Sequence, residues 1–317
     1  MNVSSFLKLV EIRTKIASVI PFSLGTLYAV YHFHAFNLKN FILLFIAMIT
    51  FDMVTTTLNN YYDYKRANIK CGYNYESHNA IVKDHLKESA VIGVIVILLA
   101  VATLFGILLF LNTNSIILGI GALSFLIGIC YSFGPVPISG TPFGEMLSGF
   151  FMGFVILFLA VFIHASGQSL VSLVIDHSVV AIRIDFVEVL YIFLMSIPTM
   201  FGIANIMLAN NICDIEDDLQ NRRYTLPNFI GKKNALWLFG SLYYFAFIAI
   251  IISSMVRILP MVYLFAVLVL IPVSKNIKLF YKNQTKKDTF ALSVQNFILI
   301  SGAQILLLAV SIVAFLK

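Results

Sequence analysis

The chain has 317 residues, of which 60% are hydrophobic and only 11% are charged. Soluble globular domains carry roughly 25% charged residues, so this composition excludes a soluble protein and indicates an integral protein of the lipid bilayer. The formal net charge is +6. In a membrane protein such a charge reflects basic loops that face an anionic leaflet, so we expect no nucleic-acid partner.

Nine apolar segments have about the 20 residues that a helix needs to cross a bilayer. In chain order they are residues 16–34, 40–60, 89–111, 115–133, 143–164, 186–210, 234–255, 258–274 and 290–316. The eighth segment, at 258–274, is the shortest. The sequence therefore predicts an all-α polytopic membrane protein with nine transmembrane helices, formed by residues 1–317 as a single domain.

Basic residues are distributed unevenly between the two sides of this predicted bundle. Nine spans place the N-terminus and the loops at 61–88, 211–233 and 275–289 on one side. The other side holds only four of the 21 Lys and Arg residues, namely Lys39, Arg183, Arg257 and Lys317. Because Lys and Arg accumulate in cytoplasmic loops, we expect a cell-membrane protein with a cytoplasmic N-terminus and an external C-terminus.

Two of the predicted helices end on the cytoplasmic side in clusters of amides and carboxylates. Residues three or four apart share a helical face, so the members of each cluster are expected to lie together. The clusters are Asn59, Asn60 and Asp63 at the end of the second span, and Asn210, Asp214 and Asp218 at the end of the sixth. One acidic residue near a helix end is usually a solvated charge, but two matched clusters half a chain apart favour a shared site.

Clustered carboxylates repel one another unless a cation neutralises them, and oxygen ligands favour hard ions such as Mg²⁺. Mg²⁺ keeps few protein ligands and commonly shares its coordination shell with substrate phosphates. Basic side chains near both clusters suit the remaining phosphate charge. They are Lys65, Arg66, Arg222, Arg223, Lys232 and Lys233. These residues predict a magnesium-diphosphate site at a membrane surface.

Asp52 lies in the middle of the second span, where a carboxylate costs a few kcal/mol on insertion scales. Two interpretations are open. Asp52 is either a functional group or a structural one that is protonated or paired with an amide, and we favour the structural role.

Four segments resemble a known family. LNNYYDYKRAN resembles the first, NDxxD, motif of the UbiA superfamily of intramembrane prenyltransferases, and NNICDIEDD resembles its second, DxxxD, motif through Asp214 and Asp218. RRYTLPNFIGKKNA and YSFGPVPISGTPFGE resemble segments of the subgroup that uses 1,4-dihydroxy-2-naphthoate. The resemblance extends over essentially the whole chain.

The resemblance implies a helical bundle around a central cavity, capped on the cytoplasmic side by loops 61–88 and 211–233. It also implies a Mg²⁺-dependent enzyme that transfers a polyprenyl group from polyprenyl diphosphate to 1,4-dihydroxy-2-naphthoate. CO₂ and diphosphate would leave, giving demethylmenaquinone in menaquinone biosynthesis. The alternatives are the same chemistry on 4-hydroxybenzoate, haem or glycerol phosphate, or a cation-coupled transporter. A transporter is disfavoured because the outer halves of the spans are almost wholly apolar.

The resemblance and the clusters together assign roles to individual residues. The expected metal ligands are Asp63, Asp214, Asp218 and Asn59. The expected catalytic residues are the same three aspartates with Glu145 and Tyr131. The expected substrate-binding residues are Asn59, Asn60, Lys83, Asn210, Arg222 and Lys232. For Glu145 two roles are open, which are to orient or deprotonate a phenolic acceptor and to cap the helix that follows Pro142.

The chain departs from the family pattern at two places. Asn60 stands where the first motif usually has an acid, and Ala67, Asn68 and Ile69 replace its later acid. Metal binding there would rest on Asp63 with amide oxygens, or mainly on the second cluster. A basic residue common in the family between residues 131 and 145 is also absent.

Overall fold

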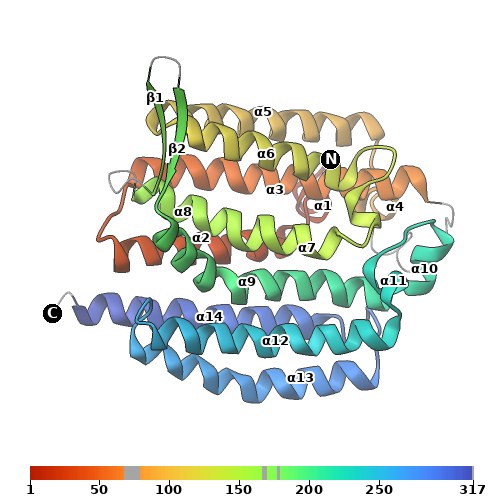
Figure 1. Ribbon diagram of the computed structural model, residues 1–317. Helices are drawn as coiled ribbons and strands as arrows, with labels where there is room; N and C mark the ends of the chain where they lie inside the picture. Colours follow the sequence, from red (N-terminus) through yellow and green to blue (C-terminus); the bar gives the residue numbers. More distant parts are fainter. Residues whose placement is uncertain (68–78, 166–169, 177–178, 316–317) are drawn as a thin grey trace.

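The computed structural model describes residues 1–67, 79–165, 170–176 and 179–315. Asn68, Ile69 and the end of the last predicted span at residue 316 lie outside the described residues. Long, roughly parallel helices make up most of the described chain (Figure 1). The longest are α2 (Ile16–His32), α3 (Leu38–Arg66), α5 (Glu88–Asn112), α6 (Ser115–Ser132), α9 (Phe186–Cys213), α12 (Lys232–Met255) and α14 (Ala291–Phe315).

Shorter elements complete or connect these helices. The short α-helices are α1 (Val3–Leu9), α4 (Ala80–Lys83), α7 (Gly144–Ser148), α8 (Ile156–His164), α10 (Ile215–Gln220), α11 (Leu226–Ile230) and α13 (Leu270–Lys282). The 3₁₀ segments are η1 (Ile12–Lys15), η3 (Ile138–Gly140) and η6 (Met261–Val269), and a π-helical turn, η4 (Gly149–Val155), joins α7 to α8. Two strands, β1 (Val171–Asp176) and β2 (Val179–Ile184), form an antiparallel hairpin.

Eight helical segments within the described residues are long and apolar enough to cross a membrane, judged by length and composition. They match eight of the nine predicted spans, with α7, η4 and α8 acting as one segment and η6 and α13 as another. The remaining predicted span corresponds to α2, which has 17 residues and so lies at the lower end of the spanning range. The prediction of an all-α polytopic membrane protein is confirmed.

The eighth predicted span differs from the structure in its bounds. The eighth span was placed at 258–274, but the helical segment runs from Met261 to Lys282, into the predicted loop at 275–289. The reason is that α13 is amphipathic, with Val273, Ile277 and Phe280 buried while the intervening lysines are not, so an apolar run stops before the helix does. The connection after α8 carries the hairpin, whose two-residue period a search for helical spans cannot detect.

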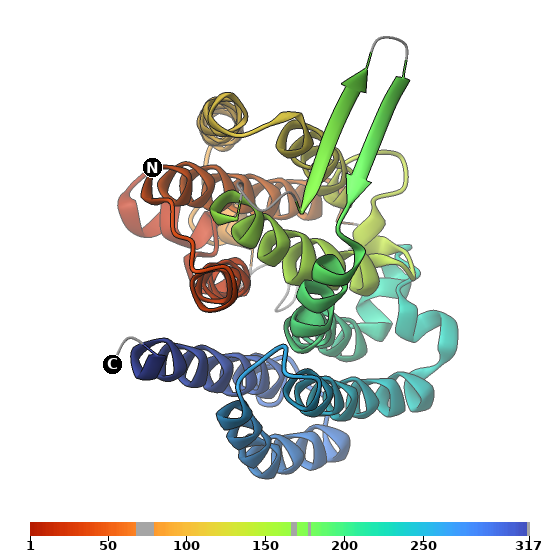
Figure 2. The same ribbon diagram turned by 60° about the vertical axis from the view of Figure 1, so that its left-hand side comes forward.

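The bundle has two different ends. Helices α4, α10 and α11 lie at one end, which we call the polar end, and the hairpin and the C-terminus lie at the opposite end (Figure 1). The hairpin projects beyond the helices in both views (Figure 2). The ends of α3 and α9 that carry the two polar clusters therefore point the same way.

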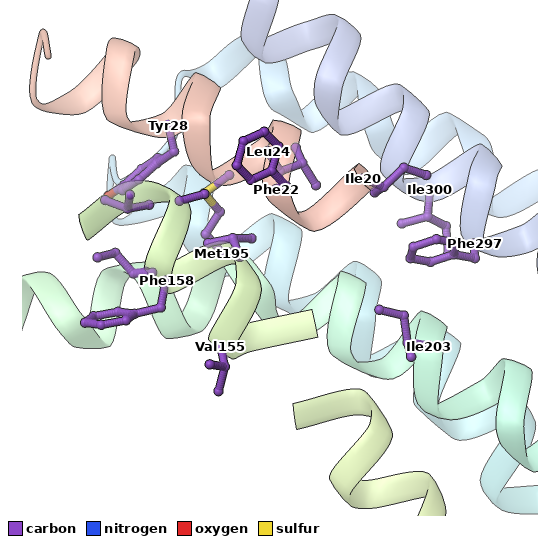
Figure 3. Close-up of a cluster of buried hydrophobic side chains, with 14 of the residues drawn as sticks. Ile20, Phe22, Leu24, Tyr28, Val155, Phe158, Met195, Ile203, Phe297 and Ile300 are labelled. Atoms are coloured by element: carbon purple, nitrogen blue, oxygen red, sulfur yellow. The ribbon is translucent and has the colours of Figure 1, made fainter. Parts of the chain in front are cut away.

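The core lies where α2, α8, α9 and α14 pack together (Figure 3). Backbones approach closely there because glycines stand at the contacts. A Cβ atom on Gly25 of α2 would lie 2.3 Å from the carbonyl oxygen of Leu157, and one on Gly153 would lie 2.5 Å from Cα of Met200. These glycines pack helices against one another within the chain and hold the walls around the central cavity.

Asp52 is paired with a lysine inside the helical bundle. Nζ of Lys15, which is 3% exposed, lies 2.7 Å from Oδ1 of Asp52 and 2.5 Å from Oγ1 of Thr56. Ser18 donates a 2.6 Å hydrogen bond to the other carboxylate oxygen. This ion pair ties η1 and the start of α2 to the middle of α3, which agrees with the structural interpretation of Asp52, although the partner is a lysine rather than an amide.

We expect Lys15→Met to destabilise the protein, because it leaves the carboxylate of Asp52 in the bundle without its cation. Removing one partner of a buried ion pair costs about 3 to 5 kcal/mol. The unfolding free energy in detergent should fall by that amount, whereas Arg13→Met, at an exposed position two residues away, should change it little. Adding Asp52→Asn to Lys15→Met should restore part of the loss, and a double variant as unstable as the single one would contradict this account.

Candidate active site

A cavity of about 1250 Å³ runs from the polar end into the bundle. One face of α3 lines it along most of that helix, and α5, α6, α9 and the segment from α7 to α8 form the other walls. Near the polar end its lining is charged and amide-rich, and deeper it is almost entirely apolar. The polar lining residues include Asn59, Asp63, Asn210, Asp214, Asp218, Arg222, Arg223 and Lys286.

The first cluster stands on the last turns of α3. Asn59 donates a hydrogen bond of 3.2 Å to Oδ2 of Asp63, one helical turn later, and accepts one of 3.2 Å from the Ser132 hydroxyl of α6. Asn60 also borders the cavity, but its amide nitrogen donates to the Leu9 carbonyl at 3.0 Å and to Glu11 at 3.2 Å. Asn59 and Asp63 therefore face the cavity as a pair, while the amide group of Asn60 anchors the N-terminal segment.

The second cluster bridges the end of α9 and the start of α10. Asp214 donates its backbone N–H to the Asn210 carbonyl at 3.1 Å, and Asp218 donates its own to the Asp214 carbonyl at 2.8 Å. The helical path thus continues through Asp214, and the three side chains stand on successive turns, as their spacing of four predicts. Oδ2 of Asp214 lies 2.5 Å from Nζ of Lys286, in the connection between α13 and α14.

Arg223 connects the two clusters. Its Nη1 donates to Oδ1 of Asp63 at 3.1 Å, and its Nε forms an ion pair of 3.2 Å with Oδ1 of Asp218. Nη2 also donates to the carbonyl of Ser139, at 3.3 Å. One guanidinium thus reaches carboxylates that are 155 positions apart in the chain and belong to α3 and α10.

The sequence analysis singled out Arg222 rather than its neighbour Arg223. Both line the cavity, but Arg222 is exposed and has a left-handed backbone with a φ of 57°. Lys286 was counted only as a loop charge, since nothing in its local sequence marks it. Which member of an Arg-Arg pair turns inward depends on the turn after α10, and a sequence pattern does not specify that turn.

Two of the three aspartates, Asp214 and Asp218, are buried, and each is paired with a cation. Burial raises the pKa of Asp218 to about 6, and the nearby charge of Asp214 acts in the same direction while Arg223 opposes it. For Arg223 burial acts to lower the pKa, but Asp63 and Asp218 outweigh it and raise the pKa above its usual range. Because the pKa of Asp218 is raised, a further cation that approaches this carboxyl group would stabilise its charged form.

Glu145 lies behind the cavity wall. It is 3% exposed, and its Oε1 accepts a hydrogen bond of 2.8 Å from the Asn211 side chain, whereas Oε2 has no hydrogen-bond partner among the described residues. Tyr131, in contrast, lines the cavity. Asn211 stands alongside the second cluster in the sequence, but it is one residue out of step with the spacing of four, so the sequence assigns it no role in the site.

Two predicted phosphate ligands lie elsewhere. Lys83 ends α4 and Lys232 begins α12, and both are exposed. Neither belongs to the described residues that line the cavity. Of the two tyrosines that follow Asn60, Tyr62 borders the cavity, whereas the hydroxyl of Tyr61 donates to Glu88 at 2.6 Å.

The carboxylate and amide oxygens at the cavity mouth are the type of ligand that a hard divalent cation prefers. Within the ranges that the structure describes, no three His, Cys, Asp or Glu side chains converge on one point as a complete metal centre. Mg²⁺ needs fewer protein ligands than that, since it usually takes one or two carboxylates together with water and substrate phosphates. Three aspartates in one cavity, beside the amides of Asn59 and Asn210, provide this type of ligand set.

Comparisons with known proteins agree with this geometry. The model of the UbiA prenyltransferase family matches residues 18–301. Among curated proteins, the 1,4-dihydroxy-2-naphthoate octaprenyltransferase of Bacillus subtilis strain 168 is 30% identical over 243 residues, which cover 75% of this chain and 70% of the relative.

Solved structures share the fold at low sequence identity. An apo UbiA homologue from Aeropyrum pernix K1 has a TM-score of 0.68 at 18% identity and covers 92% of this chain and 97% of its own. A digeranylgeranylglyceryl phosphate synthase has a TM-score of 0.65 at 16% identity, covering 98% and 99%. A UbiA homologue from Archaeoglobus fulgidus bound to DMAPP and Mg²⁺ has a TM-score of 0.63 at 13% identity, covering 96% and 99%.

The family match covers most of the chain, and the fold places both acidic motifs in one cavity of a helical membrane bundle. The chain belongs to the UbiA prenyltransferase family and is a multi-pass membrane prenyltransferase.

Proposed function

We propose that the protein transfers a polyprenyl group from a polyprenyl diphosphate to 1,4-dihydroxy-2-naphthoate, releasing CO₂ and diphosphate and forming the hydroquinone of demethylmenaquinone for menaquinone biosynthesis. The observation that carries the donor half is the cavity itself, which combines a charged mouth with an apolar interior. The acceptor half is supported by the curated relative, which is named for this naphthoate.

The charged mouth suits the diphosphate of the donor. Arg223 and Lys286 already pair with the aspartates, and with Arg222 they supply the positive charge that phosphate oxygens require. Asp63, Asp214 and Asp218, with Asn59, would hold Mg²⁺. When bound, the ion would offset the negative charge that develops on the leaving diphosphate. The amides of Asn59 and Asn210 can complete the hydrogen bonding of the anionic group.

The walls just inside the mouth suit the cationic carbon of the transferred group. Tyr62 and Tyr131 line this part, and the rings of Phe51 and Phe125 stack with centroids 3.9 Å apart at its edge. Aromatic faces attract cations, and a dry site protects the allylic cation from water. Glu145 is buried behind the cavity wall and holds Asn211, so we propose that it orients the phenolic acceptor together with Tyr131, which lines the cavity.

The remaining assignments follow from position. Lys83 and Lys232, outside the cavity lining, are proposed to contribute only to the positive field that draws the anionic donor to the polar end. Asn60 is proposed to support the site by holding the N-terminal segment. We further propose that residues 1–317 act as one domain capped by segments 61–88 and 211–233, with the polar end and N-terminus in the cytoplasm and the C-terminus outside the cell membrane.

The acceptor is tested with purified protein, Mg²⁺ and a polyprenyl diphosphate. We expect 1,4-dihydroxy-2-naphthoate labelled in its carboxyl group to release labelled CO₂ and to give a prenylated product. Parallel reactions with 4-hydroxybenzoate, haem and glycerol phosphate should give no product above background. Efficient prenylation of one of these three acceptors, with no CO₂ released from the naphthoate, would overturn the proposed acceptor.

Asp214→Asn should lower kcat/KM by about a hundredfold or more, the usual effect of losing a group that stabilises transition-state charge. Chelation of divalent ions by EDTA should abolish transfer, and added Mg²⁺ should restore it. Glu216→Gln is the matched control, because Glu216 is two residues away, exposed and not part of the described cavity lining. Full activity of the Asp214 variant in EDTA would rule out the metal-dependent mechanism.

The variants Arg223→Gln and Arg222→Gln compare the role of the inner arginine, Arg223, with that of the outer one, Arg222. Losing the inner guanidinium leaves the buried carboxylate of Asp218 without its cation, which costs roughly 2 kcal/mol, at the lower end for a buried charge pair. The Asp63 side chain is 45% exposed, so its lost ion pair adds little. We therefore expect kcat/KM to fall at least thirtyfold for Arg223→Gln, and no more than a few-fold for Arg222→Gln. Equal effects of the two substitutions, measured at saturating acceptor, would show that the bridge has no special role.

A further inference from the structure

The deep part of the cavity is lined mainly by apolar side chains, unlike the charged mouth. Lining residues follow α3 from Asp63 back to Leu44, a distance of about 28 Å at 1.5 Å per residue. Helix α5 contributes to the wall only in its second half, from Thr103 to Leu109. Apolar residues of α3, α5, α6 and α8 therefore enclose the deep part, with few polar atoms among them.

Two glycines stand at the same level of this deep part, Gly106 on α5 and Gly121 on α6. The two helices are consecutive and antiparallel, and they lie side by side (Figure 1). Gly106 is six residues before Asn112, where α5 ends, and Gly121 is six residues after Ser115, where α6 begins. Each glycine is therefore about 9 Å from the turn that joins the helices.

Packing does not explain these glycines. A Cβ atom at either position would meet no heavy atom within 4 Å. A Cβ atom on Gly128, which is on α6 like Gly121, would instead lie 2.7 Å from the Phe51 ring. A glycine inside a helix costs roughly 1 kcal/mol relative to alanine. What the missing side chains provide at positions 106 and 121 is open space in the cavity wall.

We propose that Gly106 and Gly121 keep the deep cavity open for the distal isoprene units and thereby set the longest prenyl chain that the enzyme accepts. The proposal rests on the proposed use of a polyprenyl diphosphate held at the polar end. Gly121 is 11 residues from Ser132, which contacts Asn59 at the mouth, so it lies about 16 Å deeper. With C–C bonds of about 1.5 Å, an extended isoprene unit is about 5 Å long, so roughly the fourth unit passes the glycines.

The test is Gly121→Phe, which adds bulk at this level only. Gly119→Phe is the matched control, since Gly119 is two residues away on the same helix, has equally open surroundings and is not among the described residues that line the cavity. Donors with two isoprene units (geranyl diphosphate) and four units (geranylgeranyl diphosphate) are compared by kcat/KM. Binding of the two corresponding thiolodiphosphates is measured without any acceptor.

For Gly121→Phe we expect kcat/KM for the four-unit donor, relative to that for the two-unit donor, to fall at least tenfold. The relative affinity for the two thiolodiphosphates should fall by the same factor. For Gly119→Phe both ratios should equal those of the parent protein. An unchanged ratio in Gly121→Phe, or an equal fall in the control, overturns the proposal. If Gly121→Phe fails to fold, Gly106→Phe applies the same test from α5. If the proposed acceptor is wrong, the parent protein will not prenylate the naphthoate. The binding ratio still tests the role of the glycines, because binding is measured without an acceptor.

Discussion

A single guanidinium holds the two halves of the site together. Arg223 pairs with Asp63 at the end of α3 and with Asp218 in α10, and Lys286 pairs with the remaining aspartate, Asp214. Without these cations, the buried carboxylates of Asp214 and Asp218 and the half-exposed carboxylate of Asp63 would repel one another. The same interactions leave a cavity mouth in which opposite charges alternate, which suits a substrate that carries a diphosphate.

The bilayer explains why this charge is confined to one end. Polar groups within the hydrocarbon region are costly unless they are paired, and Lys15 and Asp52 show how the bundle meets that cost where it does carry charge. Most of the deeper cavity lining is apolar, as is the lipid outside. A donor with an anionic head and a hydrocarbon tail therefore finds both of its environments along one axis, with the reacting bond at the boundary between them.

Glycines have two opposite roles in this architecture. At Gly25 and Gly153 the missing side chain allows another backbone to approach, which fixes the walls. At Gly106 and Gly121 nothing approaches, and the wall stays open. The same residue type thus both closes the bundle and enlarges its interior, and only the neighbours in three dimensions distinguish the two cases.

The sequence by itself determined the membrane class, the approximate spans and the two acidic clusters, because apolar length and helical spacing are local properties of the chain. The same spacing singles out Asp63, Asp214 and Asp218, but the structure puts Asp63 inside α3, Asp214 between α9 and α10, and Asp218 on α10. The sequence did not determine that Arg223 rather than Arg222 turns inward, that Lys286 reaches Asp214, that Asn60 anchors the N-terminal segment, or that Asn211 holds Glu145. Each of these depends on contacts between segments far apart in the chain, or on the geometry of one turn, and only the tertiary structure decides them.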